Sequence, residues 1–288
     1  MVGLEGAAGA VTAITGFEKG SGKTTFLNYA LPLVRRAGPV AVFSIGVDGA
    51  LKARDASAPP PDIRVEPGDL VMTTDAFARA ATARFEILEA LPGRSTLGRL
   101  FLGRALRGGS VTLVGNEHLS VLADVIALVR QEGWAASVLV DGAVNRMTQI
   151  AALNPQGDLA FAFTARIDRG NLARAAARIR NLSLLAALPM EPVPSADILR
   201  IDGPLASGQL AELPEGVQKL SVADFTKLFL EPAELARTLQ RVEISVRQAF
   251  RLLCFAVTLR DVSRSEFLDA VGEYADEAVL FNPYEVAC

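Results

Sequence analysis

A glycine-rich stretch near the N-terminus limits the folds open to this chain more than any other feature. The residues from Thr15 to Thr25 read TGFEKGSGKTT. An apolar run, Ala10 to Thr15, precedes the glycines and ends at Gly16, and apolar residues recur at helical spacing from Thr24 to Arg36. A short buried strand that turns through glycines into a helix is typical of the start of a βαβ unit. We therefore expect a parallel sheet with right-handed crossovers and helices on its faces.

The same stretch has the residue types that the phosphates of a nucleotide require. Gly20 and Gly22 allow backbone N–H groups to approach an anion closely. The helix that begins near Lys23 directs its partial positive charge to the same place. Lys23 would neutralise the terminal phosphates, and the hydroxyl of Thr24 would bind Mg²⁺. The predicted nucleotide-binding residues are Gly16, Lys19, Gly20, Ser21, Gly22, Lys23, Thr24 and Thr25; the alternative is a glycine-rich turn before an ordinary helix.

The match to the usual phosphate loop has two departures. The spacing Gly-x4-Gly-Lys-Thr requires glycine at position 17, where this chain has Phe17, and the nearest glycine is Gly16. Lys19 resembles the additional lysine of the deviant phosphate loops, which reaches a partner subunit's nucleotide. That lysine lies five residues before the main lysine, whereas Lys19 lies four residues before Lys23. A role for Lys19 in a partner's site is therefore not assigned.

Two aspartates are candidates for the metal and the catalytic step. Asp141 ends the apolar run SVLVDG, Ser137 to Gly142, and ligands meet a parallel sheet at such strand ends. Asp48 follows the predicted strand Val40 to Ile45 and would hold a metal-bound water or orient the attacking water. The predicted metal set is Thr24, Asp48 and Asp141, and the predicted catalytic set is Lys23, Asp48 and Asp141. A solvated aspartate in a turn remains the alternative for Asp141, and the general base stays unassigned. No Asn-Lys-x-Asp motif is present, which favours ATP over GTP.

Strand and helix patterns continue along the chain. Further strands are predicted at Leu70–Thr73, Phe85–Leu88, Arg99–Gly103, Val111–Gly115, Ser137–Val140, Leu159–Thr164, Ile198–Ile201, Leu220–Val222, Leu253–Thr258 and Ala278–Phe281. Further helices are predicted at Leu119–Gln131, Asn171–Ala187, Pro232–Arg241 and Ser265–Ala275. The Pro-rich stretch Ala56–Asp69 reads as a surface excursion, and LPMEPVPSAD, Leu188 to Asp197, as a boundary. We therefore expect a phosphate-loop nucleotide-binding domain over 1–188 and a smaller C-terminal α/β lobe over 198–288, in an α/β fold like that of the P-loop NTPases.

Composition excludes several classes of protein. The 288 residues are 50% hydrophobic, enough for a large core, and the formal net charge is only −3. We therefore expect neither nucleic acid nor an anionic membrane as a partner. No apolar run is long enough for a membrane span. Two distant cysteines and the single His118 disfavour a zinc or multi-histidine site. An N-terminus without a basic segment predicts no signal peptide, so a reducing cytoplasm is expected.

A wider set of motifs resembles a known family. GFEKGSGKTTFLNY, FSIGVDG, STLGRLFLGRAL, VLVDGAVNRMTQIA and DFTKLFL occur in this order between Gly16 and about Leu230. Together they resemble the smaller subunit of the reactivase of lysine 5,6-aminomutase and its ornithine-aminomutase counterpart. Family members have Lys-Asn-x-Gly-Lys-Thr-Thr where this chain has residues 19–25. They often have arginine where this chain has Val47, so no charged role is carried over to that position.

The resemblance implies a repair function. Such a protein, with a second, MutS-related ATPase subunit, uses ATP and Mg²⁺ to release damaged cobalamin from an adenosylcobalamin-dependent aminomutase. Two other classes stay open. One is a small-molecule ATP-dependent ligase or kinase of the same fold, which would need its own substrate pocket. The other is a non-catalytic module that senses nucleotide without turning it over.

Overall fold

The central feature of the computed structural model is a nine-stranded sheet. The structure describes residues 4–45, 62–95, 98–116, 118–142, 159–191, 195–214, 216–275 and 279–282. The strands follow the order β16 (Val279–Phe281), β15 (Arg251–Leu259), β9 (Leu159–Ile167), β1 (Val11–Gly16), β8 (Ser137–Gly142), β2 (Val40–Ser44), β4 (Leu70–Thr74), β6 (Gly98–Arg107) and β5 (Arg84–Ser95). The strands from β16 to β4 are parallel, and β6 and β5 extend them as an antiparallel hairpin. The mixed α/β class with a mainly parallel sheet, expected from the sequence, is confirmed.

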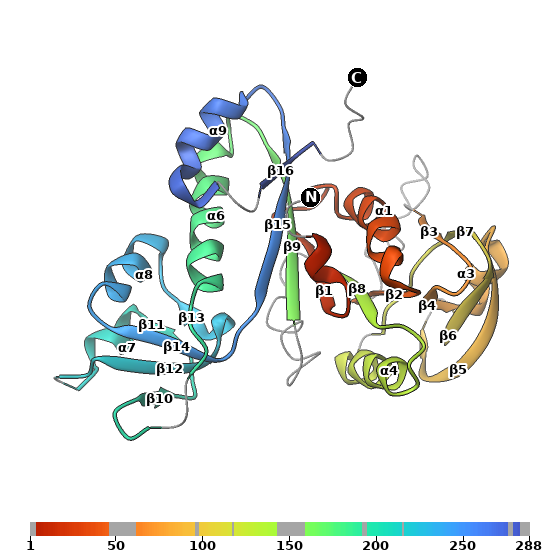
Figure 1. Ribbon diagram of the computed structural model, residues 1–288, viewed down its shortest axis with the longest axis horizontal. Coiled ribbons are helices and arrows are strands. Elements are labelled where there is room, and N and C mark those ends of the chain that lie inside the picture. The colour runs from red at the N-terminus through yellow and green to blue at the C-terminus, as the bar shows by residue number, and fades with distance from the viewer. Residues whose placement is uncertain are drawn as a thin grey trace.

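Helices cover both faces of this sheet, as Figure 1 shows for α1 on one side and α6 on the other. α1 (Lys23–Val34) buries an apolar stripe, Phe26, Leu27, Ala30, Leu31 and Val34, in one core cluster. α4 (Leu119–Gln131) and α6 (Leu172–Ala186) bury theirs in the other cluster. The strand β1 contributes to both, because side chains alternate along it: Ala13 faces one cluster and Ile14 the other. β1 is therefore an interior strand, buried along its whole length.

A smaller group of elements follows α6. Its three-stranded parallel sheet is β10 (Leu199–Ile201), β12 (Lys219–Asp224) and β14 (Glu243–Gln248), beside the pair β11 (Leu205–Ala206) and β13 (Leu228–Phe229). Its helices are α7 (Ser207–Ala211) and α8 (Pro232–Leu239). The chain then returns to the central sheet as β15, with α9 (Arg264–Val271) and β16 after it. The domain limits 1–188 and 198–288 stay a prediction, but the last two strands pair within the central sheet, because β15 is buried and needs partners on both edges.

The element predictions were mostly confirmed, with informative exceptions. Val111–Gly115 was wrong: β7 spans Gly109–Val111 and pairs antiparallel with β3 (Ile63–Val65). The buried segment after β7 lies beside β4 without a regular ladder, since only the Val114 N–H to Met72 carbonyl bond, 3.1 Å, and a Thr73 side-chain bond tie it there. The stretch expected as a surface excursion contains β3, whose Ile63 and Val65 are buried. The short helices are α3 (Asp75–Ala80) and the 3-10 turns Leu4–Ala7, Arg35–Ala37, Phe225–Lys227 and Gly272–Ala275.

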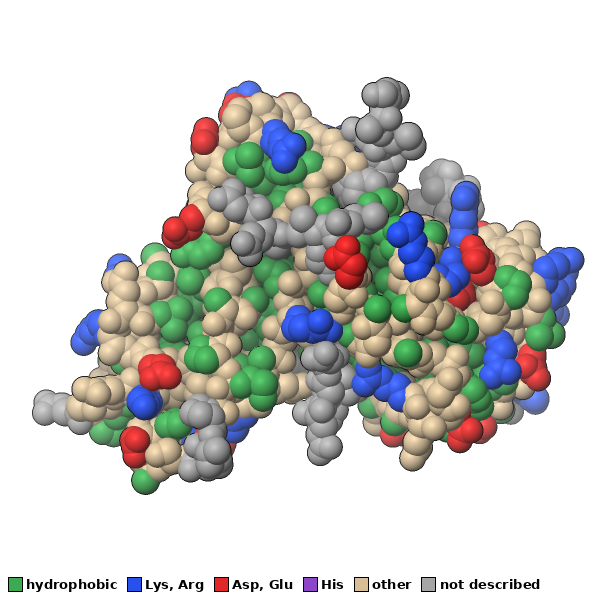
Figure 2. Space-filling model, in the orientation of Figure 1, with side chains coloured by type: hydrophobic (Ala, Val, Ile, Leu, Met, Phe, Trp, Pro, Cys, Tyr) green, Lys and Arg blue, Asp and Glu red, His purple; other side chains and the backbone are tan. Residues whose placement is uncertain are grey.

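The surface has charged side chains of both signs. Figure 2 shows acidic and basic groups interspersed over the face in view, without a broad field of one sign. Within the described residues, no helix has the length and apolar character needed to cross a membrane.

Candidate functional site

The candidate site lies at the carboxyl end of β1, in the middle of the parallel strands. Ile14 is level with Asp141 of β8, and Gly16 is level with Thr164 of β9. The carboxyl ends of these three strands therefore meet at one edge of the sheet. From β1 the chain crosses by α1 on one face, whereas the α6 crossover from β9 uses the other face. This reversal is where a doubly wound sheet forms a ligand crevice.

The backbone after β1 has the conformation that the glycines were expected to supply. Gly20 has φ 80° and Gly22 has φ 90°, values that residues with a Cβ rarely adopt. α1 begins at Lys23 immediately after Gly22, which as the N-cap residue contributes no side-chain hydrogen bond. The first turn of a helix has backbone N–H groups without intrahelical partners, and here they face the loop. The loop and the helix start thus have the geometry of an anion site.

Ser21 explains why a glycine occupies position 16. Its Oγ lies 2.0 Å from where a Cβ on Gly16 would stand, so no larger residue fits there without a shift. The same hydroxyl lies 2.9 Å from the Thr164 hydroxyl, and the Phe17 N–H donates to the Thr164 carbonyl at 2.9 Å. Ser21 is therefore turned into the sheet and anchors the loop to β9. The Ser21 backbone N–H donates to the Glu18 carbonyl at 3.4 Å, so it too is engaged within the protein.

The charged and hydroxyl residues lie at the open side of this loop. Lys23 and Thr24 are partly exposed at the start of α1, while Lys19 and Thr25 are exposed. Lys23 makes no ion pair with any described residue, so its ammonium group remains available to an anion. Their roles in binding nucleotide stay predictions.

Asp141 lies partly exposed at the end of β8, beside both β1 and β2. Its backbone carbonyl accepts from the Ile45 N–H at 3.0 Å, which fixes the strand end. Asp48, like Val47, lies outside the described residues. Within those residues no three histidine, cysteine or acidic side chains gather as a metal site. A Mg²⁺ ion held by one or two protein ligands and phosphate oxygens needs no such cluster.

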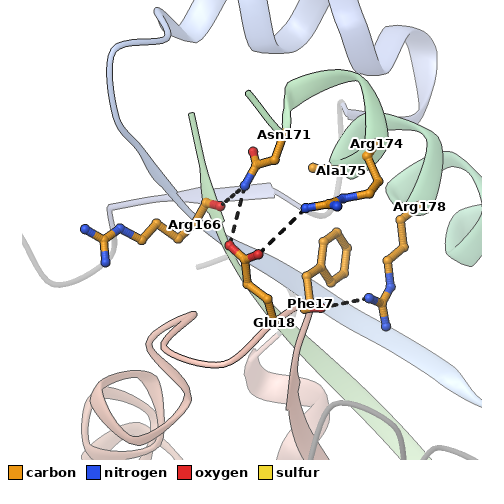
Figure 3. Close-up of a pocket in the computed structure, with 7 residues that line it drawn as sticks. All are labelled: Phe17, Glu18, Arg166, Asn171, Arg174, Ala175 and Arg178. Carbon is orange, nitrogen blue, oxygen red and sulfur yellow. Dashed lines mark hydrogen bonds and ion pairs between the residues drawn. The ribbon is translucent and has the colours of Figure 1, made fainter. Parts of the chain in front are cut away.

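A pocket of about 360 Å³ adjoins the loop on the α6 side, and sequence reasoning did not anticipate it. Figure 3 shows its lining: Phe17, Glu18, Arg166, Asn171, Arg174, Ala175 and Arg178. The first two come from the loop after β1. Arg166 comes from the end of β9, Asn171 is the residue before α6, and the last three lie on α6. The arginine side chains at 174 and 178 are one helical turn apart, which places them on one face of α6. This spacing is the sequence feature that could have predicted the pocket.

Polar contacts join the loop to α6 across this pocket. The Asn171 amide donates to Glu18 Oε1 at 3.4 Å and to the Arg166 carbonyl at 2.9 Å. Arg174 lies 3.9 Å from Glu18 Oε2. Arg178 Nη1 donates to the Phe17 carbonyl at 2.9 Å, and its guanidinium lies 4.6 Å from the centre of the Phe17 ring. Burial, and then the charge of Arg174, lower the pKa of Arg178.

Comparisons of the chain with protein-family models, with curated proteins and with solved structures found no match.

Proposed function

We propose that this chain binds ATP·Mg²⁺ at the loop from Gly16 to Thr25 and hydrolyses it, in a fold of the P-loop NTPase type. The carrying observation is the position of two positive-φ glycines and the start of α1 at the carboxyl end of the central strand β1. The level position of Asp141 on the neighbouring strand supports the same proposal. A triphosphate needs converging backbone N–H groups, a cation and a nearby acidic edge for the metal.

Each residue has a defined part in this proposal. Lys23 binds the β- and γ-phosphates, and Thr24 is a ligand of Mg²⁺ through its hydroxyl. Asp141 binds Mg²⁺ directly or through water, and Asp48 orients the attacking water. Gly20 and Gly22 place the backbone donors, while Ser21 and Thr164 hold the loop against β9. The expected result is stabilisation of the transferring phosphate by position and charge.

We further propose that the nucleotide cycle reactivates an adenosylcobalamin-dependent aminomutase, together with a MutS-related ATPase subunit, in the cytoplasm. The ordered family-like motifs between Gly16 and about Leu230 support this function. ATP would favour a complex in which the mutase is open and damaged cobalamin leaves, because a ligand shifts an equilibrium toward the state it binds better. Hydrolysis then resets the cycle.

The pocket beside the loop favours a second candidate, an ATP-dependent kinase or ligase that acts on a small molecule. Such an enzyme requires a substrate pocket next to the phosphates, and the space between Glu18 and α6 has that position. A non-catalytic nucleotide sensor is the third possibility, and it predicts binding without ADP release.

The reactivation assay tests the proposed function. Inactivated aminomutase is mixed with this protein, the second subunit, ATP, Mg²⁺ and fresh adenosylcobalamin. We expect activity to return, and damaged cobalamin to appear in the filtrate only with ATP. The Lys23→Ala protein should fail to reactivate, while Lys219→Ala, which removes an exposed lysine on β12, should behave as wild type. Equal recovery without this protein, or with Lys23→Ala, would contradict the proposal.

A further inference from the structure

We propose that the pocket between the loop after β1 and α6 is a second ligand site, which takes the carboxylate or phosphate group of a small molecule. Figure 3 shows the residues that carry the inference. Arg174 reaches toward Glu18, Arg178 lies against Phe17, and Asn171 extends its amide toward the same space. The side chain of Arg166 extends away from these groups, so its backbone carbonyl is its contribution.

The charges of the pocket do not balance. Two guanidinium groups, those of Arg174 and Arg178, face one carboxylate, that of Glu18. Among the described residues Arg178 has no carboxylate partner, although it is half buried. The Glu18 carboxylate lies by Arg174, so it leaves the positive charge of Arg178 without an ion pair. Burial and the charge of Arg174 lower the pKa of Arg178. An anion would relieve this repulsion, and guanidinium groups bind carboxylate or phosphate through paired hydrogen bonds.

The shape of the pocket fits a small molecule. Its volume of about 360 Å³ lies in the range of small-ligand sites. The Phe17 ring and Ala175 supply apolar walls, while the Asn171 amide holds the Glu18 carboxylate at the edge of the space. A ligand with one anionic group and a short apolar body would place its charge by the guanidinium groups and its body against the apolar walls. Because Phe17 and Glu18 belong also to the loop after β1, this ligand would lie next to the proposed nucleotide.

The test measures anion binding in a protein whose phosphate loop is disabled. Succinate and inorganic phosphate are titrated into the Lys23→Ala protein by calorimetry at constant ionic strength, with neutral succinamide as a control ligand. The diagnostic variant adds Arg174→Gln, a change at a side chain that is 80% exposed and therefore safe for folding. The matched control adds Arg169→Gln, which removes the same charge from the connection just before α6, where Arg169 pairs with Glu266 instead.

We expect saturable binding of at least one of the two anions and none of succinamide. Which anion binds more tightly tells a carboxylate ligand from a phosphate ligand. The Arg174→Gln change should weaken binding at least about tenfold, the effect of losing one hydrogen bond to a charged group. Arg169→Gln should leave the affinity unchanged. The inference is overturned if neither anion binds, if succinamide binds as well as succinate, or if the two variants have the same affinity. Because Lys23 is absent throughout, a failure of ATP binding in the native protein leaves this result unaffected.

Discussion

The loops after β1 and β9 join neighbouring parallel strands to helices. The two loops differ in the groups that lie just before the helix. The loop after β9 satisfies itself: the Asn171 N–H donates to Asp168 Oδ1 at 3.0 Å, and the Asp168 N–H donates to Asn171 Oδ1 at 3.0 Å. The Leu172 N–H also finds the Asp168 carbonyl at 3.0 Å. Neither helix receives a side-chain hydrogen bond from its N-cap residue, Gly22 for α1 and Asn171 for α6. The loop after β1 has Lys19 three residues before its N-cap, where the loop after β9 has the Asp168 carboxylate.

The comparison distinguishes, at one edge of the sheet, a loop with its own carboxylate from the loop that we propose binds an anion. At the start of α6 the Asp168 carboxylate accepts from the Asn171 N–H, and a negative charge there offsets the positive end of the helix dipole. At the start of α1, two positive-φ glycines precede Lys23, and we propose that the negative charge there comes from an external anion. The pocket lies between the loop after β1, which contributes Glu18, and α6, which contributes Arg174.

The largest expected effect concerns hydrolysis. Asp141→Asn keeps the size of the side chain at the end of β8 and removes its charge, so Mg²⁺ should be held poorly. We expect the rate of ATP hydrolysis to fall by roughly 10–100-fold, with little loss of stability. Phosphate release measured beside Asp124→Asn, an exposed aspartate on α4, provides the control. A lower melting temperature with normal turnover per folded molecule would instead make Asp141 a structural residue.

The next effect concerns the fit between Gly16 and Ser21. Gly16→Ala places a methyl group 2.0 Å from the Ser21 hydroxyl, so the free energy of unfolding should drop by about 1–3 kcal/mol. Ser21→Ala removes that hydroxyl, and the double variant should recover part of the loss. Chemical denaturation measures both. Gly203→Ala, where a Cβ meets nothing within 4 Å, should change little. Strictly additive losses would show that the two residues are not coupled.

A smaller effect tests the self-closed loop directly. Asp168→Ala removes the acceptor of the Asn171 N–H and should cost about 1 kcal/mol of unfolding free energy. ATP affinity should stay unchanged, because this loop is not expected to bind phosphate. Asp197→Ala removes an exposed aspartate and controls for charge. A loss of ATP affinity without a loss of stability would erase the distinction between the two loops.

The smallest effect concerns the sheet interior beside β9. Burial raises the pKa of the Cys254 thiol on β15 to about 12. Since burial disfavours the charged thiolate, the thiol of the folded protein stays protonated at pH 8. In a Cys288→Ser protein, Cys254 should therefore react with a disulfide reagent only after unfolding by denaturant. A fast reaction of the native protein would place Cys254 at an open surface.

The sequence predicted those strands whose own residues are enough to identify them. Short apolar runs predicted β1, β2, β8 and β9, because strands buried on both faces need few polar residues. β14 was missed because its sequence EISVRQ has polar residues on both sides of a short apolar centre. The return of β15 to the central sheet was also missed, since pairing with β9 depends on residues about ninety positions away.

The same distinction applies to the candidate site, where the phosphate loop was predicted from the sequence and the pocket beside α6 was not. The glycines, Lys23 and Thr24 were found because one local motif holds them. Asp141 depended on a further inference from strand ends, and its level position beside Ile14 agrees with that inference. The pocket was missed because Phe17 and Arg178 come from segments 161 residues apart. In a sequence, Arg174 and Arg178 look like the solvated face of a helix.

The most direct test of the account is calorimetric titration of ATP·Mg²⁺ into the wild-type, Lys23→Ala and Lys219→Ala proteins. The account predicts saturable binding by wild type and Lys219→Ala, and a large loss of affinity in a folded Lys23→Ala protein. ATP·Mg²⁺ at a hundredfold excess over its dissociation constant should also stabilise the wild type by about 2.7 kcal/mol. The absence of saturable binding to folded wild type, or equal affinities of wild type and Lys23→Ala, would contradict it.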